Sequence, residues 1–213
     1  KKIKSGIFKQ PVEGPIKVQS LGLEGDYQAN KKLHGGVDKA ICVYPAEHYD
    51  WWCDELKKPD LSFGDFGENL TTFGLMEDVV CLGDRFRIGS AEMVVTQPRE
   101  PCVTLNARLD IMDLSIRFRK SGRSGFYFSV AKEGILNNGD AIEYVFKDEN
   151  RVSVSEFNQV INREPGVEDI MRRASKVGVL PQKLKVFFHF YLQQYSLPLR
   201  FPEPSSHNHS RLC

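Results

Sequence analysis

The sequence lacks most of the features that assign a chain quickly to a common class of protein. Among its 213 residues there is no apolar run long enough to span a membrane, and the basic start at residues 1–4 is not followed by the apolar region of a signal peptide. The 29 basic and 28 acidic residues leave a formal net charge of +1. Bulk charge therefore gives no indication of nucleic acid or of an acidic membrane surface as a partner, and we expect a soluble globular protein.

Cysteines are too few and too scattered to form a disulfide framework. The chain has five, an odd number, and no two of them have the C-x-x-C spacing of a thiolate zinc site. Reduced thiols and a cytoplasmic location fit this usage best.

What the sequence does contain is a series of short apolar runs separated by turn-forming residues. The runs predict strands at residues 3–8, 16–21, 40–44, 70–73, 79–82, 85–89, 91–96, 126–130 and 141–146. Helices are expected after Pro45 and from Asp110 to Phe118. Short strands at this spacing are typical of a barrel or a sandwich.

The pattern changes after residue 150. Three helical stretches follow, at residues 155–161, 167–177 and 183–195, and the remaining tail contains several prolines. We therefore predict three parts: a β-rich domain over residues 1–150, a three-helix unit over residues 151–195 and a flexible tail over residues 196–213.

One loop is notable because it places a permanent cation three residues from a thiol. In residues 97–102, Pro98 and Pro101 stiffen the backbone and should end the preceding strand, so Arg99 and Cys102 come from one rigid segment. A nearby cation favours the thiolate and makes a cysteine a better nucleophile or metal ligand. Cysteine is also among the most buried residue types, so Cys102 can equally be a core residue. The local sequence leaves both interpretations open.

A second candidate segment surrounds a glycine pair. Gly35 and Gly36 allow a turn that brings backbone N–H groups close to a ligand. His34, Asp38 and Lys39 flank this turn with groups that can bind a phosphate or a polar ring. The glycine spacing is not that of a phosphate-binding loop or a dinucleotide fingerprint. A hairpin loop with a solvated histidine is the alternative.

Taken together, the chain resembles one known family. Five segments occur in the order found in MOSC domains, the molybdenum cofactor sulfurase C-terminal module: GLEGD at 22–26, HGGVDKA at 34–40, GENL at 67–70, GDRFRIG at 83–89 and QPREPC at 97–102. Each segment alone is a weak signal, but five in register are highly specific. The resemblance covers residues 1–146, and the helical remainder is similar to the three-helix C-terminal unit of the bacterial YiiM-type subgroup.

This resemblance implies a mainly β fold, in which a MOSC β-barrel-like domain with flanking helices carries the small three-helix unit. It implies that the protein binds a molybdopterin-type molybdenum cofactor, with Cys102 as a ligand to molybdenum. A soft thiolate suits such a centre. The activity implied is that of an oxidoreductase that reduces N-hydroxylated compounds, such as hydroxylated nucleobases, as small-molecule substrates.

The electrons for such a reaction have to come from outside the chain. The sequence has no cysteine cluster for an iron–sulfur centre. We therefore expect a separate reductase as the electron donor, with the three-helix unit as a candidate docking surface, and neither a nucleic acid nor a membrane as a partner.

For the remaining site residues the resemblance indicates a position rather than a contact. Arg99 would either steady the thiolate or pair with the anionic cofactor. Glu68 and Asn69 would contact the edges of the pterin or hold the site loops. The pocket would be lined by a single segment, with Lys39 and backbone N–H groups near the cofactor phosphate: His34, Gly35, Gly36, Asp38 and Lys39.

Two other functions remain open from the sequence. In the first, Cys102 carries a persulfide in a sulfur-carrier or cofactor-handling module that reduces no substrate. In the second, the helices form a module that binds nucleic acid or docks a partner, although the near-neutral charge and the lack of a basic helix face weigh against it. Bound molybdenum would distinguish the enzyme from the sulfur carrier.

Overall fold

The computed structural model describes residues 6–26 and 35–196. The predictions for residues 3–5, for His34 and for the tail at 197–213 lie outside the described residues. None of the helices within the described ranges is long and apolar enough to cross a membrane.

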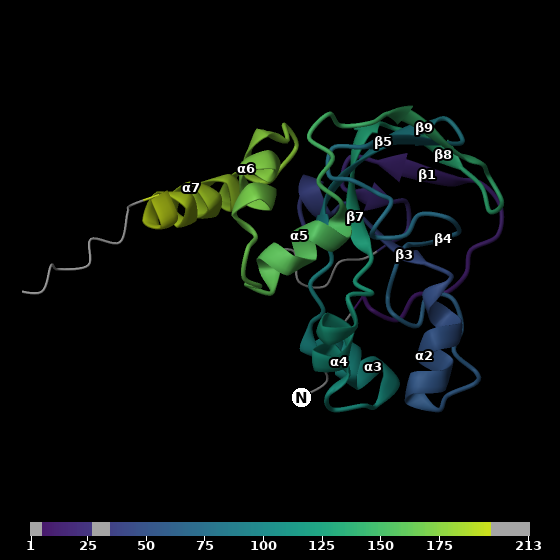
Figure 1. Ribbon diagram of the computed structural model, residues 1–213. Helices are drawn as coiled ribbons and strands as arrows, with labels where there is room; N and C mark the ends of the chain where they lie inside the picture. The colour runs from purple at the N-terminus through teal and green to yellow at the C-terminus, as the bar shows by residue number, and fades with distance from the viewer. Residues whose placement is uncertain (1–5, 27–34, 197–213) are drawn as a thin grey trace, which may run out of the picture.

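Two sheets form the β-rich part of the molecule (Figure 1). The larger one is mixed and has six strands, in the order β4 (Leu70–Thr72), β3 (Ile41–Pro45), β7 (Phe126–Lys132), β6 (Ala91–Pro98), β5 (Arg85–Ile88) and β9 (Ile142–Phe146). Only its β3–β4 pair is parallel. The smaller sheet is antiparallel, in the order β2 (Gly22–Leu23), β1 (Ile16–Gln19) and β8 (Gly134–Leu136).

The two sheets together form a half-barrel, and the helices are arranged in two groups around it. In Figure 1, α2 (His48–Leu56), α3 (Val103–Leu109) and α4 (Leu114–Ser121) gather at one end of the larger sheet. The other group stands at its side and consists of α5 (Val154–Ile161), α6 (Glu168–Lys176) and α7 (Gln182–Ser196). The prediction of a mainly β fold with flanking helices is confirmed.

Alternating side chains explain how the larger sheet buries one face. In β5 the two arginines are exposed, while Phe86 and Ile88 point into the core, which is the period-two pattern of a half-buried strand. Phe86 packs against Phe128 of β7, with 5.8 Å between the ring centroids. Burial of such large apolar side chains is the main stabilising contribution to the fold, about 1.5–3 kcal/mol for each.

The C-terminal helices share this core with the sheet. Phe157 of α5 and Phe188 of α7 are fully buried in the same apolar cluster as Phe86 and Met93. Ser153 begins α5 with a capping box, in which its side chain accepts from the Glu156 N–H and the Glu156 carboxylate accepts from the Ser153 N–H. The helical group is therefore packed against the β-rich part through apolar contacts.

Residues 79–82 do not form the predicted strand. They are turns, with a single bridge between Cys81 and Ser153. The Asp84 carboxylate accepts hydrogen bonds from the backbone N–H of Cys81 at 3.0 Å and from that of Asp148 at 2.9 Å. Such side-chain bonds to the backbone offer an alternative to a strand ladder, and this one ties the 83–89 segment to the start of the C-terminal part.

Two boundaries near the loop at 97–102 also differ from the prediction. The strand does not end before the prolines, because β6 continues through Pro98, which pairs in register with Phe126. The register shifts between Val95 and Gln97, so the strand bends there instead of ending. Asp110 does not begin a helix: it ends α3 in the left-handed conformation, with φ at 56°.

Candidate functional site

The floor of the candidate site is a row of three polar side chains across neighbouring strands. Cys42 of β3 pairs directly with Tyr127 of β7, and Tyr127 pairs with Gln97 of β6. Residues directly opposite each other on adjacent strands project from the same face of a sheet. All three are buried, so a thiol, a phenol and an amide lie side by side below the loops that follow β6 and precede β3.

The glycine-pair segment forms a short 3-10 turn, η1 (Val37–Lys39), beside this floor. The Asp38 carbonyl accepts the Thr96 hydroxyl at 2.6 Å and the Gln97 amide at 3.5 Å, which fastens the turn to β6. Gly36 has φ at 104° and ψ at 164°, a conformation that favours glycine. Apart from its chain neighbours, no described residue places an atom within 4 Å of where its Cβ would be. The backbone conformation is thus the reason for a glycine at this position.

Lys39 extends from this turn over the floor. Its ammonium group lies 5.6 Å from the centre of the Tyr127 ring. Burial lowers the pKa of Lys39, Lys183 at the start of α7 lowers it further, and Glu100 opposes this effect. The first turn of α7 therefore lies near the site and brings a second cation to it.

Arg99 is buried beside the floor. Its Nη2 donates to the Phe66 carbonyl at 2.5 Å, and its guanidinium lies 5.6 Å from the centre of the Phe118 ring. Burial raises the pKa of the neighbouring Cys42 thiol, while Arg99 lowers it by charge and by a hydrogen bond. Arg99 Nη1 is buried without a hydrogen-bond partner among the described residues, so it has one donor to spare.

Tyr127 connects these groups electrostatically. Burial is the largest cause that raises its pKa, followed by the Cys42 thiol, while Arg99 opposes the rise. Cys102 and Glu100 contribute further increases. Both cysteines of interest and the buried cation therefore lie within electrostatic range of one tyrosine, whose hydroxyl keeps its proton at neutral pH.

Cys102 itself is half-buried at the start of α3. Its sulfur lies 2.6 Å from the hydroxyl oxygen of Thr104. It borders a groove of about 570 Å³ whose other side is formed by α4, with Ser115, Ile116, Arg119 and Lys120 among the lining residues. The thiol is thus neither sealed in the core nor fully exposed.

Glu68 holds loops together in this structure. Its Oε1 accepts from the Gly64 N–H at 2.8 Å, from the Thr71 hydroxyl at 2.9 Å and from the Tyr49 hydroxyl. Its Oε2 is buried without a hydrogen-bond partner among the described residues.

Asn69 joins two of the motif segments. Its Oδ1 accepts the Cys42 N–H at 2.9 Å, and its Nδ2 donates to Asp26 at 2.8 Å. The GLEGD and GENL segments are therefore fastened to the strand that carries Cys42, which holds the floor in place.

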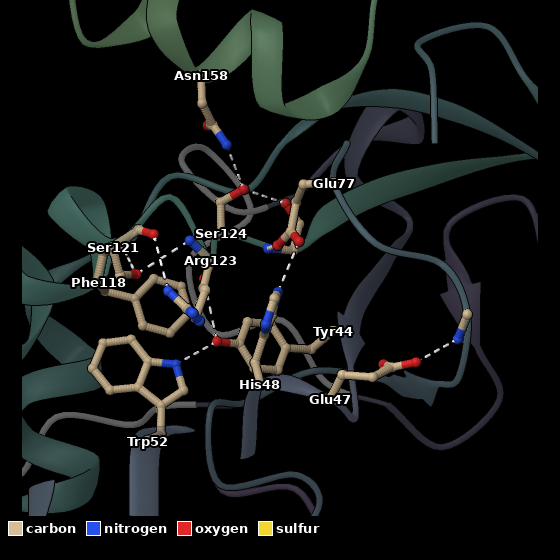
Figure 2. A network of polar contacts seen from close by, with 12 residues as sticks. Tyr44, Glu47, His48, Trp52, Glu77, Phe118, Ser121, Arg123, Ser124 and Asn158 are labelled. Carbon is tan, nitrogen blue, oxygen red and sulfur yellow. Dashed lines mark hydrogen bonds and ion pairs between the residues drawn. The ribbon is translucent and has the colours of Figure 1, made fainter. Parts of the chain in front are cut away.

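A polar network that includes His48, Glu77 and Ser124 (Figure 2) leads to the backbone of Arg99. His48 Nε2 lies 2.7 Å from Glu77 Oε2, and Glu77 Oε1 accepts the Gly125 N–H at 2.7 Å. The Gly125 carbonyl in turn accepts the Arg99 N–H at 3.1 Å. Asn158 of α5 donates to Ser124 at 2.8 Å, so the C-terminal helices are linked to the same loop.

The structure thus brings Asp38, Lys39, Arg99 and Cys102 together around Tyr127, with Gly35 and Gly36 leading into the turn. His34 lies outside the described residues. Tyr127 and Cys42 are site residues that the sequence did not single out. The sequence carried only a weak signal for them, because each is a polar or reactive residue within an apolar strand. Which residues lie beside them on the sheet depends on the register of the neighbouring strands.

Comparisons with known proteins identify the family and the fold of the chain. The family model described as the MOSC domain matches residues 30–143. The chain is 43% identical over 160 residues to YflK of Bacillus subtilis (strain 168), a match that covers 75% of this chain and 72% of YflK. It is 35% identical over 162 residues to a protein of Gibberella moniliformis named Reductase, covering 75% of this chain and 29% of that protein.

A solved structure extends the likeness to the helical part. The crystal structure of YiiM from Geobacillus stearothermophilus is 34% identical, superposes with a TM-score of 0.77, and the match covers 88% of this chain and 89% of YiiM. The order of the five motif segments, the half-barrel and the shared C-terminal helices lead to one conclusion: the chain belongs to the MOSC domain family and is of the YiiM type.

Proposed function

We propose that the protein binds a molybdopterin-type molybdenum cofactor with Cys102 as the metal ligand, and that it reduces N-hydroxylated compounds such as hydroxylated nucleobases. The observation that carries this proposal is a half-buried thiol at the edge of a groove, in a chain of the MOSC family. The fungal relative named Reductase supports an oxidoreductase rather than a carrier.

The residues present fit an anionic cofactor whose metal takes a cysteine sulfur as a ligand. Cys102 offers such a sulfur, half-buried at the edge of the groove. The unpartnered Nη1 of Arg99 is a buried donor of the kind that a phosphate or a pterin oxygen satisfies. Lys39 adds a cation at the same place. When bound, the cofactor supplies the two-electron redox chemistry.

Each side chain has a simple task on this proposal. Cys102 holds the metal, and Thr104 fixes the direction of its sulfur. Lys39 attracts the cofactor phosphate, while Arg99 donates to an anionic or carbonyl oxygen above the floor. Tyr127 stays protonated because burial raises its pKa, so its hydroxyl can donate a hydrogen bond to a bound molecule.

The reaction consumes two electrons and two protons. The N–O bond of R–NH–OH breaks, the nitrogen is reduced to R–NH2, and the oxygen leaves as water. We propose a separate reductase as the electron donor. The match with the fungal reductase covers 29% of that protein, so most of its length lies outside the part that resembles this chain and has room for a donor module.

The first test is the metal and pterin content of the full chain, purified from cells that make molybdenum cofactor. We expect molybdenum and pterin to copurify with the wild type and molybdenum to be lost from Cys102→Ser. Cys53→Ser, which removes another half-buried thiol, on α2, should retain both. A wild-type protein without molybdenum or pterin would remove the basis of the proposal.

The second test is reduction of N-hydroxyadenine to adenine by the loaded protein with a two-electron donor. Activity that survives in Cys102→Ala would show that the thiolate takes no part. If the wild type instead carries a cyanide-labile sulfur on Cys102 and no molybdenum, the protein is a sulfur carrier.

A further inference from the structure

The groove beside Cys102 has the size of a small-molecule site. Its volume is about 570 Å³, and binding clefts for small molecules generally measure about 300–1,000 Å³. On one side it begins with Pro101, Cys102 and Val103, and on the other it follows α4. Ser115, Ile116, Arg119 and Lys120 lie on one face of that helix, because residues four apart are neighbours on a helix surface.

This face combines apolar and cationic groups. Val103 and Ile116 are 77% and 58% exposed, so both present apolar surface to a ligand in the groove. Arg119 and Lys120 are also exposed, and neither forms an ion pair within the part of the chain that the structure describes.

A third cation on the same helix lies outside the groove and is neutralised. Arg117 Nε lies 2.9 Å from Asp113 Oδ2, and its Nη1 lies 3.5 Å from Glu55 Oε1. The acidic residues near α4 therefore pair with the cation that faces away from the groove. The two cations that line the groove are left to meet an anion from outside.

We propose that this groove holds the substrate, and that the substrate is a phosphate monoester: a nucleotide with an N-hydroxylated base. The phosphate lies between Arg119 and Lys120, for which a guanidinium provides paired donors. Val103 and Ile116 cover the sugar and the base, and the hydroxylated nitrogen is directed toward Cys102. The N-hydroxyl part of this assignment rests on the proposed function, whereas the preference for a phosphate rests on the groove itself.

Calorimetric titration of the full, cofactor-loaded chain tests this without turnover, because no electron donor is present. The ligands are N-hydroxyadenosine 5′-monophosphate and N-hydroxyadenosine, which differ only by the phosphate. We expect the nucleotide to bind about tenfold more tightly, the usual effect of one or two charge-assisted hydrogen bonds. The double variant Arg119→Gln/Lys120→Gln should reduce this preference to less than about twofold, and the matched control Arg117→Gln should keep it.

Equal binding of the two ligands by the wild type would overturn the inference, as would a preference that survives in the double variant. The cofactor also carries a phosphate, so pterin content is measured in the same preparations. If the double variant loses the pterin, the groove serves the cofactor phosphate and the substrate assignment is wrong.

The two proposals fail in different ways. A phosphate preference that depends on Arg119 and Lys120, in a protein that does not reduce the bound nucleotide, would leave the groove assignment standing and reject the reductase. Reduction of N-hydroxyadenine without any phosphate preference would support the reductase and reject the groove assignment.

Discussion

The hydroxyl oxygen of Thr104 lies 2.6 Å from the sulfur of Cys102, close enough to fix the direction in which that sulfur points. Both residues belong to the start of α3, so one short segment carries the thiol and its hydrogen-bond partner. Groups that orient a metal ligand in this way contribute to metal affinity without touching the metal.

If Cys102 holds molybdenum as proposed, Thr104→Val should weaken molybdenum binding. Loss of an orienting partner typically lowers metal affinity by about 10–100-fold, and Thr104→Ser, which keeps the hydroxyl, should restore it. The measurement is molybdenum retained per chain after dialysis against a competing chelator. Equal retention by the valine and serine variants would show that the hydroxyl does not orient the ligand.

Arg99→Lys should destabilise the fold even without cofactor. The guanidinium is buried and donates to the Phe66 carbonyl while it lies over the Phe118 ring, a geometry that an ammonium group cannot reproduce. Loss of a hydrogen bond from a charged group should lower the free energy of unfolding by roughly 1.5–3 kcal/mol, as measured by urea denaturation. Arg117→Lys, on the surface of α4, serves as the control and should leave the unfolding midpoint unchanged. A midpoint equally unaffected in Arg99→Lys would contradict this account.

Lys183→Gln should raise the pKa of Lys39. Burial and the nearby Lys183 charge both lower that pKa from 10.5, so removal of the second cation relieves part of the shift. The measurement is a pH titration of ¹³C-labelled lysine side chains by NMR. Lys185→Gln, two residues along α7, is the matched control, because Lys185 bonds to the Gly178 carbonyl instead. An unchanged Lys39 titration would show that α7 does not reach the site.

The lowered pKa of Lys39 also predicts how the stability of the fold depends on pH. Lys39 has a lower pKa in the folded than in the unfolded chain, so its charged form costs stability at neutral pH, and this cost is relieved as the pH rises toward 10.5. The uncharged variant Lys39→Met should thus be more stable than the wild type at neutral pH, by a difference that shrinks with increasing pH. Thermal unfolding of both proteins across the alkaline range measures this, and a constant difference would argue against it.

Phe157→Ala should lower the stability of the β-rich part as well as that of the helices. Phe157 is fully buried in the cluster that also contains Phe86 and Met93, and removal of a buried phenylalanine side chain costs about 3–5 kcal/mol. The fluorescence of Trp51 and Trp52, adjacent residues of α2, reports on a part of the molecule distant in sequence. The Trp signal and the helical signal should therefore shift together in urea.

Phe190→Ala on α7 is the control for this experiment, because its side chain is 62% exposed. Phe190→Ala should leave the urea midpoints of both the tryptophan signal and the helical signal unchanged. If Phe157→Ala moved the helical signal alone, the C-terminal helices would be an independently folding unit.

Local patterns were sufficient to predict most of the elements. The alternation at residues 85–88 predicts a half-buried strand, and the helical spacing at residues 155–161 predicts the helix observed as α5. Both patterns depend on side chains within one element. The sequence could not place Asp110, because a residue that caps the start of a helix can also end one in the left-handed conformation, and the preceding residues form α3.

The sequence by itself determined the family and the segment that presents Cys102, because five short motifs in order need no knowledge of contacts. Only the tertiary structure decided which groups surround that thiol. Cys42, Gln97 and Tyr127 become neighbours through the register of three strands, and Arg99 pairs with Cys42 and Phe66 across residues far apart in the chain. A strand's sequence specifies which residues share its face, whereas their partners depend on how other strands align with it.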